Sequence, residues 1–224
     1  MRGWIYGNSF SHGAHVAKVA LFFVCLIPLA RLILLASTDG LGANPIEFIT
    51  RSTGTWTLVL LLVTLSITPL RKLTGYNALI KVRRMLGLFA FFYVCLHFTT
   101  YIWLDQFFEW ASIVKDIKKR PFITVGFASF VLLIPLAMTS TNAMMRRLGR
   151  RWQQLHRLVY LIGIGGVVHY WWLVKKDITQ PALYALVLAI LLGYRITKWL
   201  QARKRATTPA VPRASPHLAP QKSK

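Results

Sequence analysis

The sequence is poor in acidic residues and in charge generally. Of its 224 residues only 6 are Asp or Glu, against 28 Lys or Arg, so the formal net charge is +22. Charged residues make up 15% of the chain, whereas hydrophobic residues make up 55%. A soluble domain of this size needs more charge than this to solvate its surface. The charges also fall in short clusters between long apolar runs, which is typical of a polytopic membrane protein.

Cysteine is nearly absent as well. Cys25 and Cys95 both fall within apolar runs, and we interpret them as small buried hydrophobic residues rather than a disulfide or a metal pair. No cleavable signal peptide is expected, because the first apolar run is long and no soluble mature domain follows it. There is also no G-x-G-x-x-G segment of the kind that binds a dinucleotide after a strand.

The excess of positive charge does not indicate a nucleic-acid partner. The basic residues flank apolar segments of spanning length, where the positive-inside rule places them. A spanning helix needs roughly 20 mostly apolar residues. The sequence predicts an all-α, six-transmembrane-helix bundle with spans at about 18–37, 54–70, 84–104, 121–139, 156–174 and 181–200. We place the end of the second span at Pro69, because proline breaks a helix.

The positive charges between these spans and at their ends are divided unequally between the two sides. One side has 18 of them: Arg2, Lys18, Arg71, Lys72, Lys81, Arg83, Arg84, Arg146, Arg147, Arg150, Arg151, Lys198, Arg203, Lys204, Arg205, Arg213, Lys222 and Lys224. The other side has 7: Arg51, Lys115, Lys118, Lys119, Arg120, Lys175 and Lys176. The bias predicts that both termini are cytoplasmic.

The predicted membrane domain, residues 18–200, has a short segment on either side. Residues 1–17 form a cytoplasmic N-terminal segment, whose His12 and His15 are expected to be solvated rather than to bind a metal. Residues 201–224 form a basic, Pro-rich tail that cannot bury a core and is expected to be disordered. His217 lies in this tail and is given no chemical role. No internal repeat is evident.

Two histidines lie at membrane depth, where ionisable residues are costly and usually functional. His97 is in the third predicted span and His169 in the fifth, at a similar distance from the outer surface. Because these spans run in the same direction, the two imidazoles share a level. Neutral imidazoles that face each other across a helix bundle are suitable axial ligands for haem iron. The alternative is that each histidine bonds a neighbouring carbonyl and only stabilises packing.

Small residues near the histidines favour a flat ligand. Gly165 lies one turn before His169, and Ala90 lies two turns before His97. A residue without a large side chain at these positions would let a macrocycle approach the helix.

His156 is a separate case, at the cytoplasmic edge of the fifth span. It lies 13 residues before His169, which is roughly 20 Å along a helix axis. The corresponding positions before His97 hold Arg83 and Arg84, and arginine stays protonated and does not ligate iron. The inner site is therefore incomplete for two histidine ligands, and the arginine pair suits an anion such as a haem propionate or a flavin phosphate.

Several segments carry a family resemblance that extends from about Asn44 to Trp199. They are Asn44-Pro45-Ile46-Glu47, Thr53-Gly54-Thr55-Trp56, Thr68-Pro69-Leu70-Arg71, Arg83-Arg84-Met85-Leu86-Gly87-Leu88 and Leu148-Gly149-Arg150-Arg151-Trp152-Gln153-Gln154-Leu155-His156-Arg157-Leu158-Val159-Tyr160. With His97 and His169, they resemble the haem-binding membrane subunits of bacterial methionine sulfoxide reductase systems, a branch of the ferric-reductase-like transmembrane group.

The resemblance implies haem b and FMN as cofactors in a multi-pass protein of the bacterial inner membrane. It implies that His97 and His169 are the haem ligands, that His156 contributes to cofactor binding, and that the partner is a periplasmic molybdenum-cofactor methionine sulfoxide reductase. Without a dinucleotide motif, the chain must receive electrons from a cytoplasmic flavin reductase or from quinol. Arg83, Arg84, Arg150 and Arg151 are candidate ligands of a flavin phosphate, although most of them are expected only to set topology.

Two other functions fit parts of the sequence. A quinol-oxidising cytochrome b subunit would share the haem and lack the flavin. A six-span transporter with a histidine proton relay belongs to a different class, and such proteins often have repeated halves and polar groups at mid-membrane. The few acidic residues in the predicted spans disfavour the transporter.

Overall fold

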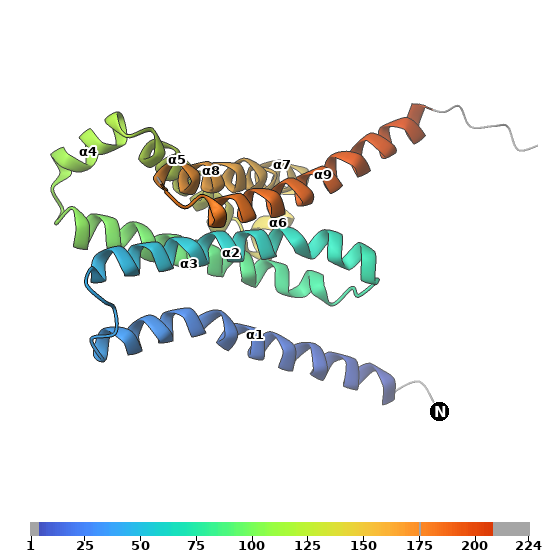
Figure 1. Cartoon of the computed structure of the whole chain (residues 1–224). Coiled ribbons are helices and arrows are strands. Elements are labelled where there is room, and N and C mark those ends of the chain that lie inside the picture. Colours follow the sequence, from blue (N-terminus) through green and yellow to red (C-terminus); the bar gives the residue numbers. More distant parts are fainter. Residues whose placement is uncertain (1–4, 175, 208–224) are drawn as a thin grey trace, which may run out of the picture.

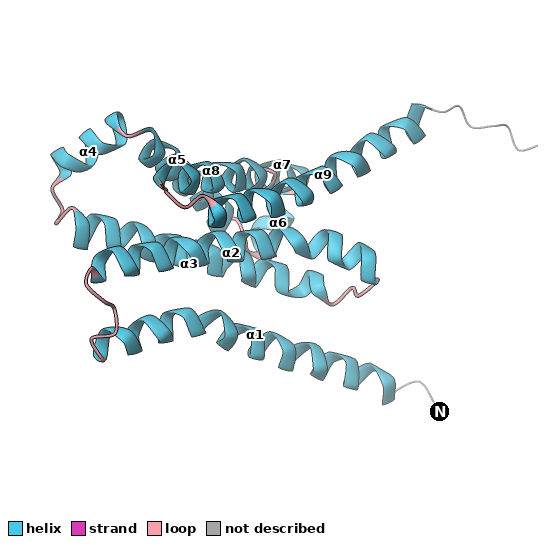
Figure 2. Ribbon diagram, viewed as in Figure 1, coloured by secondary structure: helices cyan, strands magenta, loops and turns pink. Residues whose placement is uncertain are grey.

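Helices make up all of the regular structure in the described part of the chain. The structure is a computed structural model that describes residues 5–174 and 176–207, with no strand among them (Figures 1 and 2). The elements are α1 (Ile5–Ser37), α2 (Pro45–Thr74), α3 (Leu79–Thr100), the π-helix η1 (Tyr101–Asp105), α4 (Trp110–Lys119), α5 (Pro121–Met138), α6 (Asn142–Leu148), α7 (Arg150–His156), α8 (Leu158–Leu173) and α9 (Thr179–Thr207). The predicted all-α class is confirmed.

Five helical segments are long and apolar enough to cross a membrane. They are Val16–Ser37, Pro45–Thr74, Leu79–Asp105, Pro121–Met138 and Thr179–Lys204. The chain is therefore a multi-pass membrane protein. The remaining predicted span, 156–174, corresponds to α8, whose 16 residues extend about 24 Å against a hydrocarbon core of about 30 Å. The sixth crossing remains a prediction.

The long helices alternate in direction, so their connections gather at two ends (Figure 1). The loops after α1, η1 and α8, together with α4, lie at one end. The loop between α2 and α3, the short helices α6 and α7, the first described residues of α1 and the last of α9 lie at the other end. Helix α9 continues to Thr207, past the expected boundary at 200, and residues 208–224, including His217, lie outside the described residues.

Local sequence explains where α2 begins and ends. The Asn44 side chain accepts a hydrogen bond from the backbone N–H of Glu47 at 3.2 Å, and Pro45 occupies the first turn, as is usual at a helix N-terminus. Gly75 ends the helix with a φ of +72° and donates its N–H to Arg71, the left-handed cap that favours glycine. The Asn44 to Glu47 motif is therefore a capping motif.

The hydrophobic core is centred on α2, and the outer helices remain apolar on their exposed sides. Leu58, Leu61 and Leu65 of α2 are buried, and Leu65 is fully so. On α1 and α9 large apolar residues stay exposed, such as Phe23 at 63% and Ile190 at 63%. Exposed apolar surface on this scale suits a lipid environment and not water.

A proline in α1 is matched by a tyrosine from α3. Pro28 lacks a backbone donor and its ring opens the preceding turn. The fully buried hydroxyl of Tyr93 accepts a hydrogen bond from the Leu29 N–H at 3.2 Å and donates one to the Cys25 carbonyl at 2.7 Å. In a regular helix these two backbone groups would bond each other. Tyr93 therefore bridges the opened turn and fastens α1 to α3.

The second predicted span does not end at Pro69, as the sequence suggested. Helix α2 passes through Pro69 and continues to Thr74. Proline at this position leaves the carbonyl of Leu65, four residues earlier, without its helical donor. The guanidinium of Arg195 on α9 donates to this carbonyl at 2.6 Å. The helix continues because another helix supplies the missing hydrogen bond.

Candidate functional site

The structure brings together two of the predicted residues, His97 and His169. His97 lies three residues before the end of α3, and His169 lies four residues before the end of α8. Their ring centroids are 6.2 Å apart, and the ring planes are inclined at 79°. The C-terminal ends of α3 and α8, near which both residues lie, are at the end of the bundle that carries α4 (Figure 1). The matched depth expected from the sequence thus corresponds to a close approach of the two imidazoles.

Each imidazole is oriented by one backbone carbonyl of a neighbouring helix. The Nδ1 atom of His97 lies 2.9 Å from the carbonyl oxygen of Thr50 on α2. The Nδ1 atom of His169 lies 2.7 Å from the carbonyl oxygen of Phe122 on α5. A carbonyl can only accept, so Nδ1 is the protonated nitrogen in both rings. In the neutral form, Nε2 of each histidine then has a free lone pair that can bind a metal.

Two glycines leave the space that the histidine rings occupy. A Cβ added to Gly54 of α2 would lie 3.0 Å from Cε1 of His97, and a Cβ added to Gly126 of α5 would lie 2.7 Å from Nδ1 of His169. The sequence argument missed both glycines because they belong to neighbouring helices. A usable signal was present: 43 positions separate Gly54 from His97, and 43 separate Gly126 from His169.

Gly165 and Ala90, the two small residues expected to leave space for a flat ligand, are packed against other parts of the protein. A Cβ on Gly165 would collide with the Ser129 hydroxyl of α5, so this glycine permits close contact between α5 and α8. Ala90 is fully buried in the core. We expected Gly165 to leave space for a ligand beside His169. The contact with Ser129 shows that this space is filled by α5.

One polar atom next to the histidine pair has no partner. The buried hydroxyl oxygen of Thr50 makes no hydrogen bond within the described residues. Thr50 is also the residue whose carbonyl orients His97. Buried hydroxyls are normally satisfied, so this one is free to bond a polar group of a ligand bound beside His97.

His156 lies apart from the pair, at the other end of the bundle. Its ring stacks on Trp152 with 3.9 Å between the centroids, and its Nδ1 lies 3.1 Å from the Trp152 carbonyl oxygen. Nε2 is 3.5 Å from the Ser140 hydroxyl, and the Trp152 indole donates to the Thr139 carbonyl at 3.0 Å. These contacts close the turn between α5 and α7, which needs Gly149 with its φ of +51°.

The four predicted arginines do not form one cluster. Arg84 donates to the Asn142 side chain of α6 at 2.7 Å. Arg83 is half-buried on α3. Arg150 and Arg151 are both exposed on α7. Of the four, Arg84 bonds to another helix, whereas Arg83 is half-buried and the two arginines of α7 are exposed.

The described residues contain no cluster of three or more His, Cys, Asp or Glu side chains that could hold a metal ion. Cys25 is buried and Cys95 half-buried, and both are free. A site with two protein ligands therefore suits a metal whose other ligands come with it, as the porphyrin nitrogens of haem do.

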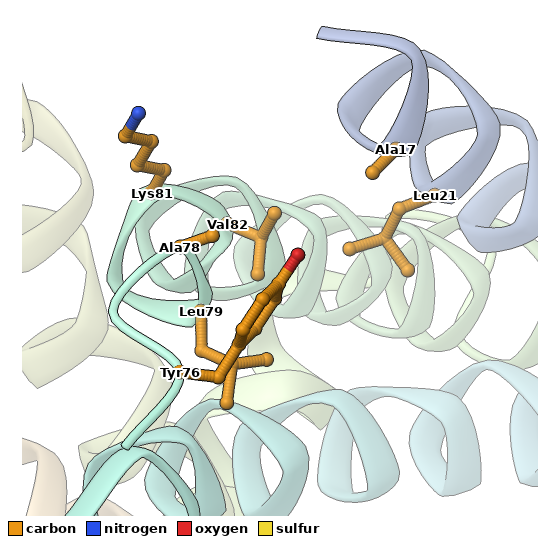
Figure 3. A pocket seen from close by; sticks show the side chains of 7 residues that line it. All are labelled: Ala17, Leu21, Tyr76, Ala78, Leu79, Lys81 and Val82. Atoms are coloured by element: carbon orange, nitrogen blue, oxygen red, sulfur yellow. The ribbon is translucent and has the colours of Figure 1, made fainter. Parts of the chain in front are cut away.

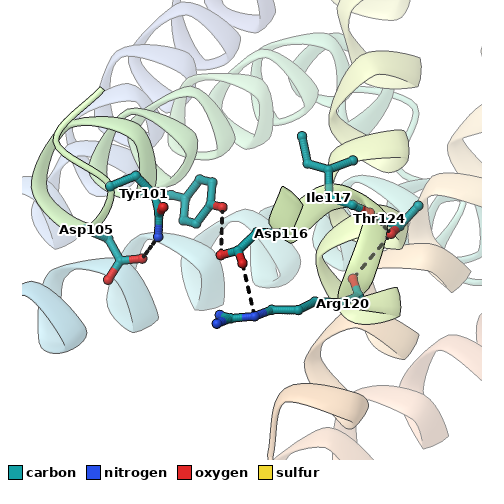
Figure 4. A network of polar contacts seen from close by, with 7 residues as sticks. Tyr101, Asp105, Asp116, Ile117, Arg120 and Thr124 are labelled. Carbon is teal, nitrogen blue, oxygen red and sulfur yellow. Dashed lines mark hydrogen bonds and ion pairs between the residues drawn. The ribbon is translucent and has the colours of Figure 1, made fainter. Parts of the chain in front are cut away.

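A polar network secures the connection from η1 to α5, which begins one helical turn after His97 (Figure 4). The carboxylate of Asp116 on α4 is buried, accepts from the Tyr101 hydroxyl at 3.3 Å and pairs with Arg120 at 3.2 Å. Beside it, the Thr124 hydroxyl donates to the Ile117 carbonyl. These contacts join η1, α4 and the start of α5, and so restrain the chain that follows the His97 helix.

A small apolar pocket lies between α1 and the beginning of α3 (Figure 3). It has a volume of about 260 Å³ and is lined by Ala17, Leu21, Tyr76, Ala78, Leu79, Lys81 and Val82. Val82 is 15 residues before His97, or about 22 Å along the helix. The pocket is therefore remote from the histidine pair and takes no part in its chemistry.

The helix bundle is that of a multi-pass, all-α membrane protein, and the sequence places this protein in the ferric-reductase-like class. The family described as ferric reductase like transmembrane component matches residues 53–167. This range includes Gly54, His97, Gly126 and His156.

Curated relatives narrow the class. The chain is 59% identical over 193 residues to the protein-methionine-sulfoxide reductase heme-binding subunit MsrQ of Ralstonia nicotianae, covering 84% of this chain and 89% of that protein. It is 58% identical over 191 residues to the MsrQ subunit of Herminiimonas arsenicoxydans, covering 84% and 88%. It is 52% identical over 208 residues to that of Xanthomonas campestris pv. campestris, covering 88% and 95%. The chain belongs to the MsrQ family. No solved structure matches it.

Proposed function

We propose that this chain binds haem b between His97 and His169 and passes electrons across the bacterial inner membrane to a methionine sulfoxide reductase. The observation that carries the proposal is the facing pair of imidazoles with 6.2 Å between their centroids. The relatives, which are named as heme-binding subunits of a methionine sulfoxide reductase, support it.

The spacing of the two rings fits a single metal between them. Imidazole–metal bonds are about 2.1 Å long, and an imidazole nitrogen lies about 1.1 Å from its ring centroid, so two axial rings have centroids about 6.4 Å apart. The separation of 6.2 Å is close to this value. The unpartnered Thr50 hydroxyl also fits a ligand with polar substituents. The residues present therefore fit haem.

Haem, when bound, supplies a one-electron carrier whose potential depends on its axial ligands and its surroundings. In this role, Nε2 of His97 and of His169 would bind the iron. The carbonyls of Thr50 and Phe122 hold the proton on Nδ1 and so keep Nε2 unprotonated. The surrounding helices leave both imidazoles half-buried.

The direction of electron transfer follows from the proposed topology. With both termini cytoplasmic, the histidine pair lies toward the periplasm, where a molybdenum-cofactor methionine sulfoxide reductase can collect electrons. The donor acts at the other end, where His156, Arg83, Arg84, Arg150 and Arg151 lie. We assign this end to a cytoplasmic flavin reductase with FMN, as the family resemblance implies, and keep quinol as the alternative donor.

The test is the visible spectrum of the purified full-length chain beside three variants. We expect the unmodified protein to show the Soret band of a low-spin haem. His97→Ala and His169→Ala should each lose it, because each removes an axial ligand. His156→Ala should keep the band, because the contacts of His156 are local to the turn between α5 and α7.

Two outcomes would contradict the proposal. A colourless protein would exclude haem and revive the transporter, and full haem retention in both outer variants would exclude these ligands. The same preparation distinguishes the donors: co-purifying FMN supports the flavin route, whereas haem reduction by quinol in flavin-free protein supports the alternative.

A further inference from the structure

We infer that Gly54 and Gly126 are positioning residues that set the orientation of the two histidine ligands. The inference rests on the proposed haem function. It concerns the groups that contact each imidazole along its Nδ1–Cε1 edge. In both cases the histidine ring lies against a helix at the point where a side chain is missing.

Helix geometry explains why the missing side chain matters. The Cα–Cβ bond of a helical residue tilts toward the N-terminus, so a side chain covers the carbonyl four residues earlier. Thr50 is four residues before Gly54, and Phe122 is four residues before Gly126. These are the two carbonyls that accept from the histidines. Glycine uncovers the carbonyl, whose second lone pair can then accept from Nδ1 in addition to the helical N–H.

The same arrangement is built twice, at an offset of 72 residues. His97 and Thr50 are 47 positions apart, and so are His169 and Phe122. One copy is the α2–α3 pair and the other is the α5–α8 pair. General close packing would not place a glycine, a carbonyl and a ring in the same register in two helix pairs. The repetition indicates that the orientation of the ring is the property being fixed.

The two glycines differ in the space between them and the histidine ring that each contacts. A Cβ on Gly126 would be 2.7 Å from Nδ1 and 2.9 Å from Cε1 of His169, whereas a Cβ on Gly54 would be 3.1 Å and 3.0 Å from the same atoms of His97. Contacts below 3.0 Å require one group to move. Since the added methyl approaches Nδ1, His169 would have to give up its hydrogen bond to Phe122. His97 needs a shift of only a few tenths of an ångström.

The experiment uses the haem-loaded full-length chain with Gly126→Ala and Gly54→Ala. The readouts are haem affinity, the ferric low-spin EPR spectrum and the haem midpoint potential. We expect Gly126→Ala to weaken haem binding by about 10- to 100-fold, the usual effect of disturbing a partner behind a metal ligand. Gly54→Ala should keep most of its haem with a shifted EPR spectrum and potential.

The controls are Gly166→Ala on the helix of His169 and Gly87→Ala on the helix of His97. Their added methyl groups would meet only Leu58 at 3.5 Å and Thr64 at 3.7 Å. Both controls should match the unmodified protein in all three readouts. The inference is overturned if Gly126→Ala and Gly54→Ala match it too.

A double variant separates ligand orientation from simple misfolding. If Gly126→Ala fails to fold, combining it with His169→Ala removes the ring that the methyl group meets, and folding should return. Persistent misfolding in the double variant would make Gly126 merely structural and overturn the inference. If His97→Ala and His169→Ala both retain haem, the proposed function itself fails. If they lose haem while the glycine variants are unaffected, only the inference fails.

Discussion

At the scale of single residues, Arg195 has a structural task that its charge alone does not suggest. Its guanidinium donates to the carbonyls of Leu65 at 2.6 Å and of Leu191 at 3.1 Å. The Leu65 carbonyl needs this donor because Pro69 cannot supply the helical one. An intramembrane arginine, usually taken as a functional site, here completes the backbone hydrogen bonding of another helix.

We therefore predict that Arg195→Leu destabilises the bundle by about 1–2 kcal/mol, because it leaves the buried Leu65 carbonyl unpaired. In a Pro69→Ala background the cost should be clearly smaller, since the N–H at position 69 then pairs with that carbonyl. The measurement is the free energy of unfolding in mixed detergent micelles for the two single variants and the double variant. Equal costs of Arg195→Leu in both backgrounds would show that the two residues are independent.

The close approach of the two histidines could be predicted from the sequence, but the groups that contact their rings could not. His97 and His169 are conspicuous because an imidazole is costly in an apolar span and both have the same depth. Gly54, Gly126 and the two acceptor carbonyls are ordinary within their own helices. Their role depends on which helices pack together, which hydrophobic periodicity does not specify.

At the scale of elements, α1 is attached to the bundle by a few buried side chains and by the hydroxyl of Tyr93. Most of its large apolar side chains are exposed, while Cys25 and Leu32 are buried. Tyr93 joins α3 to both sides of the turn opened by Pro28. A helix with so few buried side chains depends strongly on such a contact.

Tyr93→Phe should loosen α1 while leaving the other helices packed. Losing the two hydrogen bonds of the hydroxyl should cost about 1–2 kcal/mol, which would raise the opening of α1 roughly 5- to 30-fold. The measurement is the rate at which a maleimide labels the buried Cys25 in solubilised Cys95→Ala protein. Tyr76→Phe, which removes a hydroxyl from an exposed tyrosine, is the control. Equal labelling of the two variants would argue against the bridge.

The predicted spans correspond to the long helices, but several helices begin or end at other residues than predicted. Helix α2 begins at Pro45, nine residues before the expected 54, because the Asn44 cap lies beyond the apolar run. The fifth span is divided at Arg157 into α7 and α8. An apolar run reports the part of a helix in lipid, whereas caps and packing contacts set where the helix stops.

At the scale of the whole molecule, the two histidines come from two helix pairs with matching register. No repeat is evident in the sequence because few side chains are shared at the offset of 72 residues. Arg84 in the first pair corresponds to His156 in the second. This mismatch leaves α3 without a histidine opposite His156 at that end of the bundle. The two helix pairs therefore match in register at the two histidines and differ at the end where the donor is proposed to act.

The orientation in the membrane gives the last prediction. In the sequence, 18 Lys and Arg residues are assigned to one end of the bundle and 7 to the other. The end that holds α7 is the more basic one. The positive-inside rule then places α4 in the periplasm and α7 in the cytoplasm. Ser112 of α4 and Gln153 of α7 are both exposed, so a cysteine at either position would be open to reagents.

In a Cys25→Ala, Cys95→Ala background, Ser112→Cys should react with a membrane-impermeant maleimide in intact spheroplasts. Gln153→Cys should react only after the membrane is permeabilised, and equal labelling of both variants in permeabilised cells is the control. The reverse pattern would invert the topology and place the histidine pair on the cytoplasmic side. Electrons could then not leave the haem toward a periplasmic reductase, so this measurement also tests the direction of the proposed electron path.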